Sequence, residues 1–245
     1  MMPSVVGFVA LALGVVLGST LNAAAGFGFS LLTVPLMALV IGPKEAVVLS
    51  AVMSVGSNGT VAWQSRGDIE RGIGGRLLGG ALLGMPVGLV ALSKLDAKPL
   101  QVLIGVAVLA SAGVLALGIQ LHRPNSPTDV GVGFVSGMFK TSVGVSGPPV
   151  VILLQGRGLA KAAFRATSAT VIVVINFVSL VLFAGAGQFD RVVLAAALVS
   201  LPALPVGYWL GDRIHERVPE SRFRSLVLVM VAISAGLALY GAIAG

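Results

Sequence analysis

The chain has 245 residues, of which 56% are hydrophobic and only 10% are charged, and its mean hydropathy is +1.02. Soluble domains carry about 25% charged residues, so this composition excludes an ordinary soluble globule and favours a membrane protein. Because cysteine is absent, disulfides, thiolate metal sites and thiol catalysis are excluded. We interpret the net charge of +7 as basic loops that orient a membrane protein, and we expect no nucleic-acid partner.

Taken in chain order, the first 21 residues are apolar but lack the basic start of a signal peptide, so we expect them to belong to the structure. Apolar stretches of roughly 20 residues, the length that crosses a bilayer core, then recur along the chain. They occupy 44–63, 73–92, 99–121, 166–184, 192–210 and 225–244.

Two further apolar stretches, 4–41 and 129–156, each contain a polar, glycine-rich break. The first break reads Asn22-Ala-Ala-Ala-Gly26-Phe-Gly28-Phe-Ser30, and the second reads Lys140-Thr-Ser-Val-Gly144-Val-Ser146-Gly147-Pro148-Pro149. Lipid offers no hydrogen-bond partners, so a broken helix is tolerated in a membrane only where it lines an enclosed cavity. Matching breaks in two halves point to the binding site of a transporter.

The two halves of the chain resemble each other over most of their length. Five landmarks recur in the same order: Gly26 and Gly144, Asn58 and Asn176, Gly67-Asp-Ile-Glu-Arg71 and Gly187-Gln-Phe-Asp-Arg191, Met85-Pro86-Val-Gly88 and Leu204-Pro205-Val-Gly207, and Ala110-Ser-Ala-Gly113 and Ile233-Ser-Ala-Gly236. We therefore predict an all-α polytopic membrane protein made of two inverted repeats, residues 1–121 and 129–245, in one integral membrane unit. Each repeat consists of a broken or re-entrant helix pair plus three transmembrane helices.

The loop charges predict the orientation. If each broken element enters and leaves on one side, one membrane face carries eleven of the 16 basic residues, namely Arg66, Arg71, Arg76, Arg123, Arg157, Lys161, Arg165, Arg213, Arg217, Arg222 and Arg224. The other face carries Lys44, Lys94, Lys98 and Arg191. The positive-inside rule then favours inverted halves with both termini outside. Two full crossings by each broken element give the same parity, so hairpins and full helix pairs both stay open.

The breaks predict an anion site. The second arm of a hairpin begins at the midplane, where its free N–H groups and positive dipole end favour anions. Ser146 suits an N-cap and Pro148 a first-turn position in the second copy, and Ser30 or the backbone at Gly26 and Gly28 suits the first. Lys140 lies at the break and would supply charge; the alternative is that its side chain snorkels to the membrane surface.

Asn58 and Asn176 occupy equivalent helix positions and would contact substrate, although hydrogen bonding between helices is an equal alternative. We interpret Ser50, Ser54, Thr167, Ser168 and Thr170 as helix-packing residues, Arg165 as an interface anchor or gate, and Trp63 and Trp209 as aromatic-belt residues. The predicted substrate-binding residues are Asn22, Gly26, Phe27, Gly28, Asn58, Lys140, Thr141, Ser142, Gly144, Ser146, Gly147 and Asn176.

Several of these motifs resemble the sulfite exporter TauE/SafE family. They are the glycine-rich break before an apolar run with proline, the helix starts at 46–51 and Arg165-Ala-Thr-Ser-Ala169 with a later asparagine, and the Gly-(Asp/Gln)-(Ile/Phe) loops. The resemblance covers essentially the whole chain. It implies export, or sometimes uptake, of sulfite, thiosulfate-like anions or organosulfonates across a bacterial inner membrane.

The main prediction is therefore a secondary transporter or facilitator that exports a small sulfur-containing anion, with the anion and the lipid bilayer as its partners. An anion channel and a divalent-cation transporter are the alternatives, although a cation site would want carboxylates or histidines at the breaks. A Ser–Lys intramembrane enzyme, with Ser142 or Ser146 beside Lys140, is a further alternative. We expect no enzymatic activity, no cofactor and no metal. Assembly with further copies of the chain stays open.

Overall fold

The structure is a computed structural model that describes residues 3–25, 28–118, 121, 124–217, 232, 235, 236 and 240. All regular structure within these residues is helical. In chain order the elements are α1 (Val5–Ala25), α2 (Phe29–Ile41), α3 (Pro43–Gln64), the short 3₁₀ helix η1 (Arg66–Asp68), α4 (Arg71–Lys94), α5 (Ala97–Ala116), α6 (Ser126–Val143), α7 (Gly147–Gly156), α8 (Lys161–Gly185), α9 (Arg191–Ser200) and α10 (Ala203–Arg217).

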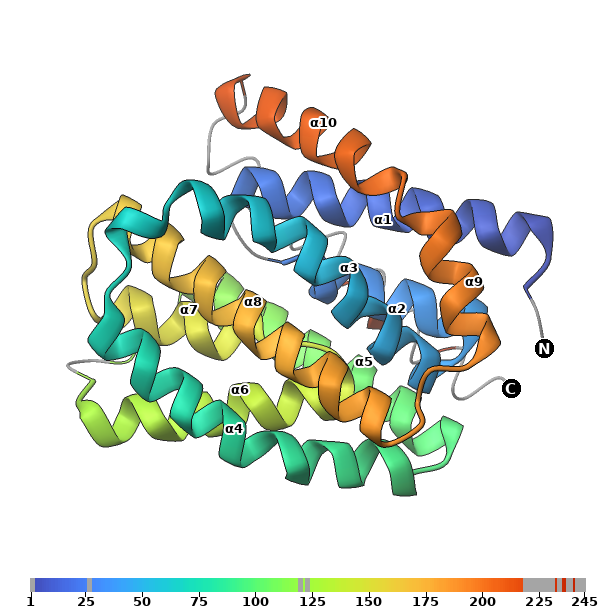
Figure 1. Cartoon of the computed structure of the whole chain (residues 1–245), viewed down its shortest axis with the longest axis horizontal. Coiled ribbons are helices and arrows are strands. Elements are labelled where there is room, and N and C mark those ends of the chain that lie inside the picture. The colour runs from blue at the N-terminus through green and yellow to red at the C-terminus, as the bar shows by residue number, and fades with distance from the viewer. Residues whose placement is uncertain are drawn as a thin grey trace.

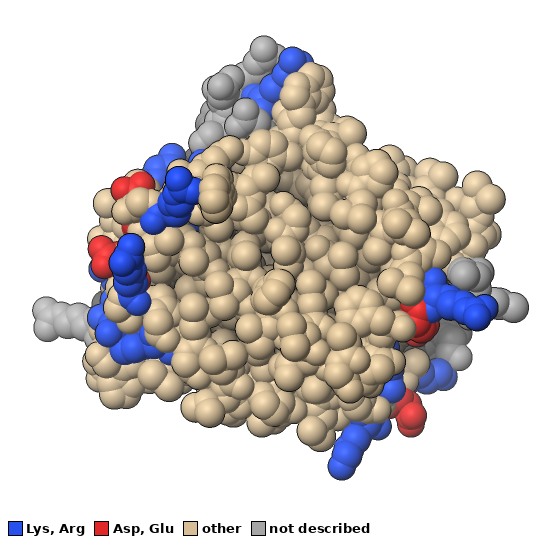
Figure 2. Space-filling view, viewed as in Figure 1, with Lys and Arg blue, Asp and Glu red and all other residues tan. Residues whose placement is uncertain are grey.

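Five helices of the described chain are long and apolar enough to cross a membrane, namely α1, α3, α4, α5 and α8. Four of them occupy the predicted spans 44–63, 73–92, 99–121 and 166–184. The long helices run along the longest axis of the molecule, and most of their connections gather at its two ends (Figure 1). Charged side chains also gather at these ends, with a broad uncharged band between them (Figure 2). The protein is an all-α polytopic membrane protein.

Both predicted breaks separate two helices. The first lies between α1 and α2, and Gly28, at φ 103°, directly precedes α2. The second lies between α6 and α7, where Gly144, at φ 80°, ends α6 and Ser146 precedes α7. The second helices have only 13 and 10 residues, well short of the roughly 20 that cross a bilayer core. In each pair the second helix runs back against the first (Figure 1).

The predicted single span 192–210 is divided into α9 and α10, which meet at an angle of 46°. The helix is interrupted at Leu201 and Pro202, and proline lacks the N–H that would continue the helical ladder. The predicted last span, 225–244, lies almost entirely outside the described residues. The predicted element 129–156 begins slightly earlier than expected, at Ser126.

The closest helix packing joins α4 and α6 through glycine. Gly80, Gly84 and Gly88 recur every four residues on α4, and a Cβ atom on any of them would lie 2.0–2.1 Å from a carbonyl oxygen of α6. A Cβ atom on Gly133 or Gly137 of α6 would lie equally close to a carbonyl oxygen of α4. Small residues at this spacing let two helix backbones touch, the usual device of membrane helix pairs.

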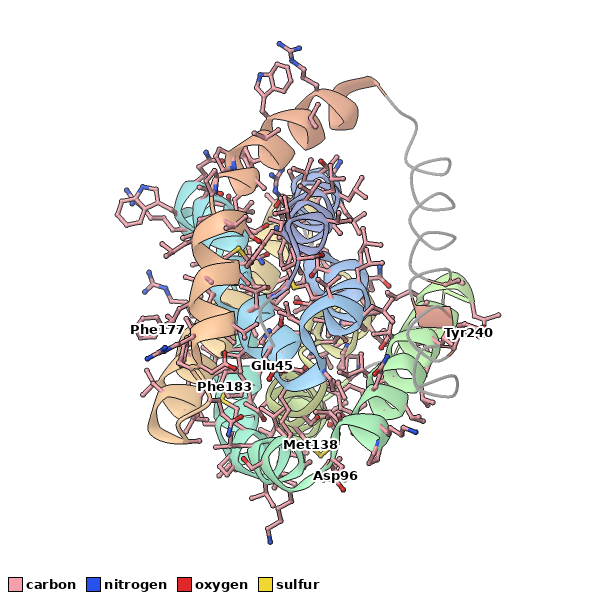
Figure 3. The ribbon with its side chains drawn as sticks, turned by 90° about the vertical axis from the view of Figure 1, so that its right-hand side faces the viewer. Glu45, Asp96, Met138, Phe177, Phe183 and Tyr240 are labelled. Atoms are coloured by element: carbon pink, nitrogen blue, oxygen red, sulfur yellow. The ribbon has the colours of Figure 1, made fainter. Side chains whose placement is uncertain are left out.

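A similar contact joins the start and the later part of the chain. A Cβ atom on Gly207 of α10 would lie 2.5 Å from the carbonyl oxygen of Val16 in α1, and one on Gly211 would lie 2.4 Å from that of Thr20. Seen end-on, α1 and α2 lie between α5 on one side and α8 with α9 on the other (Figure 3). This arrangement places both breaks inside the bundle.

Candidate functional site

A small pocket lies where the two breaks meet. Its cavity volume is about 20 Å³, counted as the space open to the centre of a water molecule, and the pocket is open on one side. Its walls come from the end of α1, the start of α2, the middle of α3, the break before α7, the start of α7 and the middle of α8. The lining residues are Asn22, Gly28, Phe29, Ser30, Leu31, Ser54, Asn58, Val145, Ser146, Gly147, Pro148 and Ile172.

Five of the predicted substrate-binding residues line this pocket: Asn22, Gly28, Asn58, Ser146 and Gly147. Gly26 and Phe27 lie outside the described residues. The remaining predicted residues, Lys140, Thr141, Ser142, Gly144 and Asn176, are not part of its described lining, and neither is Arg165. The structure therefore brings together the start of α2, the start of α7, Asn22 and Asn58, but not Asn176.

The start of α2 offers the pocket a set of hydrogen-bond donors. Gly28 adopts a left-handed conformation with φ 103°, which glycine accepts without strain, and no side chain caps the helix. The first backbone N–H groups of a helix have no partner within it, which here are those of Phe29, Ser30 and Leu31. The hydroxyls of Ser30 and Ser54 lie 3.2 Å apart at the pocket wall. This end of the pocket is suited to an anion.

The start of α7 offers fewer backbone donors than an ordinary helix. Ser146 occupies the predicted N-cap position, but its side chain makes no capping hydrogen bond. The next residues are Gly147, Pro148 and Pro149, and proline has no N–H. The Ser146 carbonyl accepts a hydrogen bond of 3.2 Å from the Ser136 hydroxyl, which ties the break to α6. The free donors here are therefore the N–H of Gly147 and the Ser146 hydroxyl.

The two asparagines of the pocket are buried, with 1% of Asn22 and 2% of Asn58 exposed. Nδ2 of Asn22 donates to the carbonyl and hydroxyl of Ser57, at 3.3 and 2.9 Å. Nδ2 of Asn58 donates to the Ser54 carbonyl at 3.1 Å. Within the described residues, the Oδ1 atom of each side chain has no hydrogen-bond partner. Both side chains belong to residues that line the pocket, and each has a buried acceptor that the described residues leave unpaired.

Lys140 lies behind the second break rather than in the pocket wall. It is fully buried in the last turn of α6. Its Nζ donates to the Ser50 hydroxyl at 3.2 Å and to the carbonyl of Gly144 at 3.0 Å. Within the part of the chain that the structure describes, no carboxylate forms an ion pair with it. Because Gly144 directly precedes the pocket residues Val145 and Ser146, the lysine supports the backbone of the break.

Three other predicted polar residues make hydrogen bonds within or between helices. The Thr141 hydroxyl donates to the carbonyls of Met85 and Gly137, at 2.7 and 3.1 Å. The Ser142 hydroxyl donates to the Met138 carbonyl at 2.7 Å. Nδ2 of Asn176 donates to the Ile172 carbonyl at 2.7 Å, one turn back along α8.

The sequence analysis did not predict a cluster of three charged residues at the end of the α6–α7 pair that lies away from the break. Asp129, in the first turn of α6, is fully buried. It accepts hydrogen bonds from Nε of Arg76 at 2.8 Å and from Nη2 of Arg157 at 2.5 Å. Arg76 belongs to α4 and Arg157 ends α7, so one carboxylate joins three helices. Both arginines were counted as loop charges, and nothing in their spacing indicated a common partner.

Ser30 and Ser54 also line the pocket, although neither was among the predicted substrate-binding residues. Ser30 was considered only as a cap, and Ser54 was assigned to helix packing. Their positions in the sequence could have indicated this. Ser30 lies two residues after Gly28, and Ser54 lies one helical turn before Asn58 on the same face of α3. The predicted aromatic-belt residues Trp63 and Trp209 are exposed, and the guanidinium groups of Arg66 and Arg213 stack on their rings at 4.2 and 3.8 Å.

Comparison with known proteins gives the chain a family. The model of the family described as "Sulfite exporter TauE/SafE" matches residues 10–238. A "Probable inner membrane transporter protein TsaS" from Comamonas testosteroni is 32% identical over 169 residues, covering 67% of this chain and 70% of that protein. A "Probable sulfite/organosulfonate exporter TauE" from Cupriavidus necator is 24% identical over 234 residues, covering 91% and 90%. No solved structure is significantly similar. The chain belongs to the sulfite exporter TauE/SafE family.

Proposed function

We propose that this protein is a secondary transporter or facilitator that exports a small sulfur-containing anion, sulfite or an organosulfonate, from the cytoplasm. The observation that carries the proposal is the pocket between the first turns of α2 and α7, inside a bundle of apolar helices. Helix N-termini bind anions through free N–H groups and the helix dipole. The hydroxyl of Ser146 and one of the paired hydroxyls of Ser30 and Ser54 would add neutral donors, as a site that must also release its ligand requires.

We further propose that the two halves are inverted repeats. The equivalent glycines Gly88 and Gly207 support this, because each packs on the first helix of the other half's broken pair. Gly88 meets α6, and Gly207 meets α1. Asn58 and Asn176 are likewise equivalent, and each Nδ2 donates to the carbonyl four residues before it. The charge bias of the loops favours an orientation with both termini outside and the Arg-rich end in the cytoplasm.

Lys140 acts in this proposal as a positive charge one layer behind the anion. Its Nζ donates to the Gly144 carbonyl, so it holds the break in the conformation that exposes the N–H of Gly147. A charge in a region from which water is excluded acts over a longer range than in water. The bound anion would thus be stabilised by the lysine without contacting it directly.

The alternatives predicted from the sequence gain less support. A divalent-cation site needs carboxylate or imidazole ligands, whereas the described lining of the pocket contains amides, hydroxyls and apolar groups. A Ser–Lys enzyme needs the lysine against its nucleophile, whereas the hydroxyl that accepts from Lys140 belongs to Ser50. An anion channel would use the same pocket and differs from a transporter only in its gating.

The proposal is tested with the purified full-length protein. We expect sulfite, methanesulfonate or larger sulfonates to raise the melting temperature in a saturable manner, because a ligand that binds only the folded state stabilises it. Phosphate, acetate and Mg²⁺ serve as comparison ligands. Proteoliposomes loaded with sulfite should then release it faster than sulfite-loaded liposomes that lack the protein. Stabilisation by Mg²⁺ alone, with no response to any sulfur anion, would refute the proposal.

A further inference from the structure

The polar groups of the pocket are of two kinds, and an ordinary anion satisfies only one of them. The first turns of α2 and α7 and two serine hydroxyls offer donors, namely that of Ser146 and whichever of Ser30 and Ser54 does not donate to the other. The amides of Asn22 and Asn58 are oriented the other way, with their Oδ1 atoms unpartnered among the described residues. A fully deprotonated oxyanion has no hydrogen to donate, so it would leave both amide oxygens unpaired.

The orientation of these amides follows from their neighbours. Nδ2 of Asn22 lies 3.3 Å from the Ser57 carbonyl, and Nδ2 of Asn58 lies 3.1 Å from the Ser54 carbonyl. A backbone carbonyl can only accept a hydrogen bond. Turning either amide over would place two acceptors against each other, so the oxygen is the atom left over for a ligand.

We propose that the pocket selects an anion that also carries one hydrogen-bond donor, an O–H or N–H group, which donates to the amide oxygen of Asn58 or of Asn22. Hydrogensulfite has such an O–H on the oxyanion itself. A hydroxy- or aminosulfonate has one on its substituent. This inference rests on the proposed function, because it assumes that a sulfur anion occupies the pocket.

The energetic argument is that a buried acceptor without a partner is costly. Leaving a buried polar group unpaired costs about 1–3 kcal/mol, which corresponds to roughly 5- to 150-fold in affinity at 1.4 kcal/mol per tenfold. A ligand with a donor removes this cost, whereas an isosteric ligand with a methyl group in its place does not. The preference should therefore be about tenfold.

Two pairs of ligands of matched shape test the proposal on the purified protein by thermal-shift titration. Hydrogensulfite, at a mildly acidic pH where it predominates, is compared with methanesulfinate, in which a methyl replaces the hydroxyl. At the same pH, 2-hydroxyethanesulfonate is compared with 1-propanesulfonate. We expect the donor-bearing member to bind about tenfold more tightly in at least one pair. A preference confined to the first pair assigns the donor to the oxyanion, and one confined to the second assigns it to the substituent.

The chain contains a matched control for the asparagine. Asn176→Leu removes the equivalent amide of α8, which has the same bond to the preceding turn and the same unpartnered Oδ1 but does not line the described pocket. At least one of Asn58→Leu and Asn22→Leu should lower the affinity ratio toward 1, whereas Asn176→Leu should leave it unchanged. Because the preference is a ratio within one variant, a general loss of stability does not alter it.

The outcomes separate the two proposals. If no sulfur anion stabilises the protein, the proposed function fails. If sulfur anions bind but the two members of each pair bind equally to the wild type, the proposed preference for a ligand with a donor is wrong and the proposed function stands. The same conclusion follows if Asn58→Leu and Asn22→Leu both keep the wild-type preference. Should a variant fail to fold, the ligand pairs on the wild-type protein still decide.

Discussion

The glycine contact between α4 and α6 allows a sharp prediction about how the second break is held in place. A Cβ atom at Gly84 would lie 2.0 Å from the Phe134 carbonyl oxygen and 2.8 Å from its carbon. Cβ atoms essentially never come within 3.0 Å of such atoms, so Gly84→Ala must push the two backbones apart by about 1 Å or more. Overpacking of this kind typically costs 1–3 kcal/mol.

The same helix supplies the control. Gly79 has nothing within 4 Å of its ideal Cβ position, so Gly79→Ala adds a methyl group facing open space. Alanine favours the helix over glycine by about 0.5–1 kcal/mol. We therefore expect the two substitutions to change the free energy of unfolding in opposite directions, by a difference of roughly 1.5–4 kcal/mol.

The assay is unfolding of the purified protein in mixed micelles, paired with a titration of the best-stabilising sulfonate. Because α6 leads directly into Val145 and Ser146 of the pocket, moving α6 should also weaken anion binding in Gly84→Ala. Gly79→Ala should bind like the wild type. If Gly84→Ala unfolds like Gly79→Ala, the two backbones are not in contact and the reasoning is wrong.

Three other measurements address charge and topology. Lys140→Met should weaken anion binding, but by less than the roughly 10- to 150-fold that a direct charged hydrogen bond of 1.5–3 kcal/mol would give, with Lys140→Arg intermediate. Wild-type affinity in Lys140→Met would assign binding to the helix N-termini alone. Asp129→Asn should lower the free energy of unfolding by about 1–3 kcal/mol, because two partly exposed arginines lose their buried carboxylate partner, whereas Asp68→Asn, at an exposed position, should have almost no effect. Cysteines replacing Ser65 and Gln188 should label from opposite sides of the membrane, and labelling from one side would contradict the inverted arrangement.

The positions of the breaks could be predicted from the sequence because glycine, serine and proline interrupt otherwise continuous apolar runs. Gly28 and Gly144 both adopt positive φ angles, which is the property that makes glycine informative in such a run. The spans were predictable for the same reason, since a length of roughly 20 apolar residues is fixed by the bilayer. The bend between α9 and α10 was not predicted, because proline alone does not decide whether a helix is interrupted. Pro86 lies inside the continuous α4, whereas the helix at Pro202 is interrupted.

The composition of the pocket was only partly predictable. Asn22, Asn58 and Ser146 were recognised because a polar residue in an apolar segment stands out. Ser54 was not, because serine is also a common packing residue between membrane helices. The partnership of Asp129 with two arginines depends on residues about 30 and 50 positions away. Only the packing of α4 against α6 and α7 brings these charges together.

The two breaks are equivalent in sequence but differ in what they offer a ligand. The α2 break ends in Phe29, Ser30 and Leu31, each with a backbone N–H, whereas two of the first three residues of α7 are prolines. The α7 side lacks those donors and has a buried lysine one layer behind instead. Direct hydrogen bonds to an anion would therefore come mainly from the α2 side, while the lysine would add a longer-range attraction from the α7 side. The unpaired amide oxygens of Asn22 and Asn58 belong to residues that line the same pocket, and under our proposal a ligand with its own donor would pair with one of them.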